Sequence, residues 1–163
     1  MSQIIIEPGE RRQTEIIIQT RKGNNILNIQ EHELIPYLLH LVEEYDRQYK
    51  EPFVFFVNNP SPIYNCHGLV FGNRRAQIWD SQEIAKIIKE DDYTMVDMNN
   101  VRVGDVIIYY GDNGDAEHSG LVIGKKGVIP LILSKWGFGR EAVHTFNQCP
   151  YSFANIKYYR ISK

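Results

Sequence analysis

The chain has 163 residues, of which 43% are hydrophobic, so it is long and apolar enough for one domain with its own core and does not resemble a disordered chain. Its formal charge is −2 and its basic residues are scattered, which gives no electrostatic footprint for nucleic acid. No apolar run approaches the roughly 18 residues of a membrane span. The two cysteines, Cys66 and Cys149, do not suggest a disulfide scaffold or a zinc site, although a single bridge is compatible with an oxidising compartment.

The N-terminal apolar run of residues 4–6 is followed at once by Glu7 and Pro8. It is too short for the apolar region of a signal peptide and has no basic segment before it. We therefore expect a protein that starts out in the cytoplasm, with export by a non-classical route as the open alternative.

The first half of the chain contains short β-branched runs, then a helical period, then a strand before Cys66. Apolar residues from Leu34 to Tyr45 recur at helical spacing, and Pro36 is compatible with a helix only in its first turn. Asp80 or Ser81 is a suitable cap for a further helix. The predicted elements are strands over residues 2–6, 14–19, 26–29 and 53–57, and helices over residues 33–49, from Cys66 onward, and over 81–89.

The second half is dominated by β-rich runs separated by glycine-containing turns. We expect strands over residues 103–110, 118–123, 128–135 and 155–161. The turn over residues 111–115 is rich in Asp and Gly, but its spacing does not match a calcium-binding loop, so we expect no metal there. The pattern predicts an α+β fold with helices packed on a C-terminal antiparallel sheet, in a single domain over residues 1–163. Residues 1–50 are either an N-terminal extension of two or three strands and a helix or part of the fold.

Cys66 lies where a loop with Pro60 and Pro62 gives way to an apolar run. A cysteine in the first turn of a helix has a lowered pKa, which favours the nucleophilic thiolate. The alternative is a small buried hydrophobe, which is how most free cysteines behave.

A nucleophilic cysteine needs a base, and His118 is the best placed of the five histidines because it opens a predicted strand directly after a flexible acidic turn. His67 projects about 100° away from Cys66 on a helix, so it is expected to line a pocket rather than take the thiol proton. His144 is a second candidate base.

Three segments resemble the NlpC-type cell-wall peptidases. Residues 65–70 (Asn-Cys-His-Gly-Leu-Val) resemble the family's Asp-Cys-Ser-Gly-Leu/Phe-Val nucleophile motif, and residues 103–107 resemble its Gly-Asp-Leu-Val strand. Residues 117–122 resemble its His-Val-Gly-Ile-Tyr histidine strand. The order and spacing are similar to those of the wider papain-like group, including its amidase (CHAP-type) branch, over roughly residues 53–137.

The resemblance implies a papain-like fold and a cysteine hydrolase or acyl transferase acting on an amide, with Cys66 as nucleophile and His118 as base. It places Ser134 at the third, orienting position, and Trp136 either shields the His118 contact from water or is an ordinary core aromatic. Asn65 and His67 stand where the family has an aspartate and a serine that help to bind the peptide stem. The oxyanion donors would be the Cys66 backbone N–H and one of the side chains of Asn58, Asn59 and Asn65.

The expected substrate is a peptide or protein amide, in a cell-wall peptidase or in a bacterial toxin or effector that would have an inhibitor or immunity partner. No cofactor, metal, nucleic acid or membrane is expected. The alternative is a catalytically silent papain-like domain that binds a peptide or protein partner, with Cys66 as a structural thiol.

Overall fold

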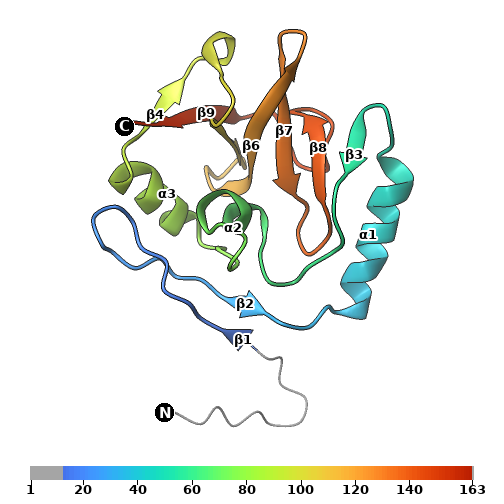
Figure 1. The fold of residues 1–163 in the computed structure, drawn as a ribbon, viewed down its shortest axis with the longest axis horizontal. Coiled ribbons are helices and arrows are strands. Elements are labelled where there is room, and N and C mark those ends of the chain that lie inside the picture. Colours follow the sequence, from blue (N-terminus) through green and yellow to red (C-terminus); the bar gives the residue numbers. More distant parts are fainter. Residues whose placement is uncertain (1–12, 163) are drawn as a thin grey trace.

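A computed structural model describes residues 13–162 of the chain. It has an α+β architecture, in which a seven-stranded antiparallel sheet has the order β3-β8-β7-β6-β5-β9-β4 (Figure 1). The helices are α1 (Pro36–Gln48), α2 (Cys66–Phe71), α3 (Ser81–Glu90) and the 3-10 helix η1 (Met98–Asn100). The strands are β1 (Gln13–Thr14), β2 (Gln30–Glu31), β3 (Val54–Phe56), β4 (Tyr93–Val96), β5 (Val106–Tyr110), β6 (Ala116–Lys126), β7 (Ile129–Lys135), β8 (Glu141–Thr145) and β9 (Ile156–Ile161).

The predicted α+β class is confirmed, as are the helices that the sequence marks most clearly. Pro36 stands at the start of α1, where its missing N–H would have no helical partner. The Asp80 carboxylate accepts a hydrogen bond from the backbone N–H of Gln82 and so caps α3. Ile84 and Ile87 of α3 are buried, as the helical period predicts.

The sheet buries a separate cluster on each of its two faces, because successive side chains of a strand point to opposite sides. On β5, Val106 and Ile108 belong to a cluster with Ile84 of α3, against which residues of α2 pack. Ile107 and Tyr109 belong to the other cluster, against which Tyr45 of α1 packs. We call these the α2 face and the α1 face.

The predicted strands over residues 14–19 and 26–29 are wrong, because only Gln13–Thr14 and Gln30–Glu31 are strands in that region. The side chain of Asn28 replaces a backbone partner: its Oδ1 accepts from the Ile16 N–H at 3.1 Å and its Nδ2 donates to the Ile16 carbonyl at 2.7 Å. Ile18 and Ile26 are buried in the α2-face cluster. The predicted strand over residues 2–6 lies outside the described residues.

Two strands of the seven-stranded sheet, β4 and β8, were not predicted. β4 exposes Thr94 and Met95, so it lacks the apolar alternation of a half-buried strand. β8 buries the polar residues Glu141 and His144, and the side-chain partners of Glu141, which are Tyr64 and Arg74, come from distant parts of the chain. Composition does not reveal either strand, because β4 is identified by its pairing with β9 and β8 by its place between β3 and β7.

Candidate functional site

Cys66 is the first residue of α2, as predicted. The preceding Asn65 is the N-cap: its Oδ1 accepts from the backbone N–H groups of Gly68 at 2.9 Å and Ile78 at 3.1 Å, and its Nδ2 donates to the Ile78 carbonyl at 2.8 Å. Gly68 lets the helix approach the chain closely, since a Cβ there would lie 1.8 Å from the Ala76 carbonyl oxygen. Asn65 therefore holds the start of the helix, and its amide is engaged in that role rather than as a free oxyanion donor.

The Cys66 thiol is buried, and burial raises its pKa to about 11. The backbone N–H groups of Ser119, His67 and Cys66 itself oppose this increase, as does the charge of Lys135. The resting cysteine is therefore a protonated thiol at neutral pH, because burial outweighs these groups, and the lowered pKa expected for a cysteine at the start of a helix is not found.

A cavity of about 580 Å³ opens beside Cys66, between the first residues of α2 and α3 and the turn that connects β5 and β6. Its lining includes three carboxylates and, among the described residues, no Lys or Arg. Trp79, which is 59% exposed, forms an aromatic part of the wall. The lining residues are Asn65, Cys66, His67, Trp79, Asp80, Ser81, Gln82, Asn113, Asp115, Ala116 and Glu117.

His118 is completely buried and points to the α1 face, in register with Tyr109 of β5. Its ring stacks on Tyr151, with centroids 3.6 Å apart and planes 7° apart. Neither ring nitrogen has a hydrogen-bond partner in residues 13–162. The expected pair with Cys66 is thus not hydrogen-bonded in this structure. Burial, and then the neighbouring histidines His144 and His67, hold the pKa of His118 well below its usual value, so its ring is neutral.

His67 lines the cavity, as predicted, but both of its nitrogens are engaged. Its Nε2 lies 3.0 Å from the Ala116 carbonyl oxygen, which can only accept, so Nε2 carries the proton. Its Nδ1 then accepts from the Ser119 hydroxyl at 2.9 Å. Burial lowers the pKa of His67 to about 4, which is consistent with this neutral tautomer. His67 therefore ties α2 to β6 and has no free nitrogen for a substrate.

Ser134 does not orient His118, so that prediction is wrong. The Ser134 hydroxyl lies 2.6 Å from Nε2 of His144 and accepts from the indole N–H of Trp136 at 3.0 Å. The Nδ1 of His144 donates to the Thr145 carbonyl at 2.7 Å, so Nε2 accepts the Ser134 proton. The strand register brings His144 of β8, rather than His118 of β6, to Ser134.

Trp136 is a core aromatic, the second of its two predicted alternatives. It is 1% exposed and makes edge-on ring contacts with Tyr45, Tyr49 and Phe56 at 5.6, 4.9 and 5.2 Å. The exposed Asn59 lies in the loop before α2 but is not among the residues that line the cavity.

Lys135 is a buried site residue that the sequence argument missed. Its Nζ donates to the carbonyls of Ser61 at 2.9 Å, Gly137 at 2.9 Å and Gly139 at 2.7 Å. It also lies over the Tyr64 ring, 5.0 Å from the centroid. The available signal was alternation along the strand, because a residue on the opposite side from Ser134 faces the loop that leads to Cys66.

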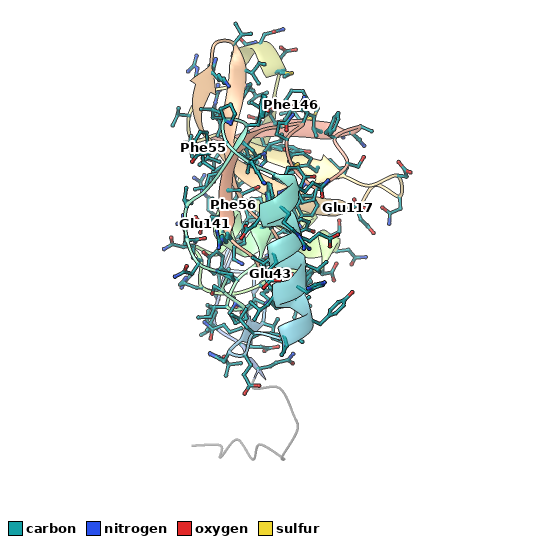
Figure 2. All side chains as sticks on the ribbon, turned by 90° about the vertical axis from the view of Figure 1, so that its right-hand side faces the viewer. Glu43, Phe55, Phe56, Glu117, Glu141 and Phe146 are labelled. Atoms are coloured by element: carbon teal, nitrogen blue, oxygen red, sulfur yellow. The ribbon has the colours of Figure 1, made fainter. Side chains whose placement is uncertain are left out.

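Glu141 forms a second polar group beside this loop. It accepts from Arg74 at 2.6 and 3.1 Å and from the Tyr64 hydroxyl at 2.5 Å, and its backbone N–H donates to the Asn58 side chain at 2.7 Å. Asn58 is therefore engaged with the loop rather than free to contact a substrate. Figure 2 shows Glu141 and the cavity residue Glu117 on opposite sides of the molecule, so the two carboxylates belong to different groups.

Within residues 13–162 there is no group of three or more His, Cys, Asp or Glu side chains arranged to hold a metal ion. Over the same residues, none of the helices combines the length and the apolar character that a membrane crossing requires. No family model, curated protein or solved structure matches this chain.

Proposed function

We propose that the protein is a papain-like, cysteine-dependent hydrolase or acyl transferase acting on amide bonds, with Cys66 as nucleophile and His118 as base. The observation that carries the proposal is the state of His118. Three histidines are buried, and both nitrogens of His67 and of His144 are hydrogen-bonded, whereas neither nitrogen of His118 is within the described residues.

A buried polar group without a partner costs about 1–3 kcal/mol, so its presence needs an explanation. A base in catalysis needs a nitrogen that is free to take a proton. The stacking of His118 on Tyr151 holds the ring by its face and leaves both nitrogens free.

Cys66 lies beside β6, next to the residue that follows His118, although the His118 side chain points to the α1 face of the sheet. The Ser119 N–H that acts on the Cys66 thiol belongs to the residue directly after His118. Tyr151, whose ring stacks on His118, also interacts with Cys66. Burial raises the pKa of Tyr151, and the charge of Cys66 raises it further. The step that we propose therefore requires the His118 imidazole to reorient toward the Cys66 sulfur.

The chemistry follows from these groups. His118 takes the thiol proton as the Cys66 sulfur bonds to the substrate carbonyl carbon, and the Cys66 backbone N–H donates to the resulting oxyanion. The imidazolium then returns the proton to the amine as the C–N bond breaks, which leaves a thioester. Water or a second nucleophile releases the acyl group, and this last step separates a hydrolase from a transferase.

The cavity indicates which amides fit. Its carboxylates at Asp80, Asp115 and Glu117 favour a positively charged group close to the scissile bond, and the exposed face of Trp79 suits the same charge. A peptide or protein amide with a neighbouring amine or basic side chain is the substrate class that we propose.

A catalytically silent domain that binds a basic peptide in this cavity is the second candidate. It is favoured by the burial of Cys66, which raises the thiol pKa to about 11. In that case His118 would be an unsatisfied core residue with no chemical role.

The test is the pH dependence of iodoacetamide alkylation between about pH 5 and about pH 10, read by mass spectrometry at Cys66 and Cys149 separately. Burial alone predicts a Cys66 midpoint near pH 11. A working pair predicts a midpoint well below the ~8.5 of a free thiol, which is lost in His118→Leu.

Two controls accompany this test. His144→Gln replaces an equally buried histidine that is already hydrogen-bonded, and it should leave the Cys66 profile unchanged. Cys149, whose thiol is also buried, reports on general opening of the fold in the same sample. A Cys66 midpoint that His118→Leu does not move would establish the silent domain instead.

A further inference from the structure

We propose that the Lys135 ammonium is the positioning group of the Cys66 site: it joins the loop that leads to Cys66 to the turn after β7, and its charge stabilises negative charge on the Cys66 sulfur. The inference rests on the proposed role of Cys66 as a nucleophile. This task of Lys135 differs from the one that the family resemblance gives to Ser134, which is to orient the base.

The first support is the number of hydrogen bonds. Lys135 is completely buried, and its Nζ has three carbonyl acceptors, from Ser61, Gly137 and Gly139. A neutral amine has two N–H groups and an ammonium has three, so the three acceptors match the charged form. Burial lowers the pKa of Lys135 to about 7 even though the charges of Glu141 and Cys66 oppose this decrease, so the three acceptors, rather than the pKa, assign the charged form.

The second support is where these acceptors lie. Ser61 belongs to the loop that ends at Cys66, and its own N–H donates to the Phe138 carbonyl at 3.1 Å. Gly137 and Gly139 belong to the turn that connects β7 to β8. The ammonium therefore sets the position of the loop from which α2 and its cysteine begin.

The third support is the balance of charge around Lys135. Glu141 is its partner in register on β8, but Arg74 already neutralises that carboxylate through two hydrogen bonds. Tyr64, whose ring faces Nζ, is uncharged because its pKa is raised to about 12 by burial and by its hydrogen bond to Glu141. The positive charge of Lys135 therefore acts on Cys66 as well as on Glu141, and Arg74 shares the Glu141 carboxylate with it.

The experiment compares Lys135→Met with Tyr64→Phe, using the Cys66 alkylation midpoint as the readout. Both variants remove a tether of the same loop, because Tyr64→Phe deletes the hydrogen bond to Glu141, but only Lys135→Met removes a charge. We expect Lys135→Met to raise the midpoint by about one pH unit or more and Tyr64→Phe to leave it unchanged.

Equal shifts in the two variants would show that Lys135 is merely a tether, and no shift in Lys135→Met with the fold intact by near-UV circular dichroism would also overturn the proposal. If Lys135→Met does not fold, Lys135→Gln keeps hydrogen bonding without the charge and is expected to show the same shift. If neither variant folds, ¹³C NMR of the lysine side chains in the unaltered chain decides: the proposal fails if Lys135 is neutral at the pH where Cys66 reacts.

This result is separable from the proposed function. If His118→Leu leaves the Cys66 midpoint unchanged while Lys135→Met raises it, the role of Lys135 stands and the role of His118 as base falls. If His118→Leu raises it and Lys135→Met does not, the opposite conclusion follows.

Discussion

His118 and His144 lie on the same face of the sheet and are equally buried, yet their surroundings differ. His144 lies on β8, next to β7. The Ser134 hydroxyl and the carbonyl of the following residue, Thr145, form hydrogen bonds with its two ring nitrogens. His118 stands on β6, where its contacts are the rings of Tyr109 and Tyr151. Burial alone therefore does not distinguish a structural histidine from a candidate base, whereas the presence of hydrogen-bond partners for the ring nitrogens does.

The largest expected effect is the loss of stability on replacing His144, the histidine whose ring nitrogens are both hydrogen-bonded. His144→Ala leaves a cavity beside Trp136 and removes the partner of the buried Ser134 hydroxyl, so we expect the free energy of unfolding to fall by about 3 kcal/mol. Urea denaturation measures it, and the exposed His40→Ala is the control, with an expected change near zero. If His144→Ala lowered the free energy of unfolding no more than His40→Ala does, His144 would not be a structural histidine.

The next largest effect is the loss of stability at acidic pH. Burial lowers the pKa of both His67 and His144 to about 4, below the ~6.5 of an unfolded histidine. The unfolded chain therefore binds these protons first, and the stabilisation that is present above about pH 6.5 is lost as the pH falls toward 4. We expect each histidine to contribute a loss of about 2 kcal/mol between about pH 6.5 and about pH 5.

Urea denaturation at several pH values measures this loss in the unaltered chain and in His144→Gln. The variant should show a shallower decline over the same range, because one of the titrating groups is gone. Equal slopes would mean that His144 is not buried in its neutral form.

The smallest effect is expected at His118. Replacing it by Leu removes a buried polar group that has no hydrogen-bond partner in residues 13–162 and fills much of the same volume, so the free energy of unfolding should stay the same or rise by up to about 1 kcal/mol. His67→Leu is the matched control. It leaves the Ser119 hydroxyl and the Ala116 carbonyl without their His67 hydrogen bonds, so it should lower the free energy of unfolding by about 2 kcal/mol. A similar loss in both variants, by urea denaturation, would show that His118 has structural partners after all.

Much of the fold could be predicted from local signals. Pro36 at the start of α1 and Asp80 as the cap of α3 act within one helical turn, and the loop prolines end just before Cys66 at the start of α2. The order of the strands in the seven-stranded sheet could not be predicted from such signals. β3 joins the edge of the sheet by pairing with β8, and β9 lies between β5 and β4.

Local sequence signals were enough to predict the three α-helices, the class of fold, and the position of Cys66 as the first residue of a helix, but not the 3-10 helix η1. The tertiary structure alone decided the partners: His144 rather than His118 for Ser134, and the carbonyls of two loops for Lys135. The physical reason is distance along the chain. Capping and periodicity act between neighbours in sequence, whereas the partner of a buried polar group depends on sheet order and register, which bring together residues such as Ser61 and Lys135.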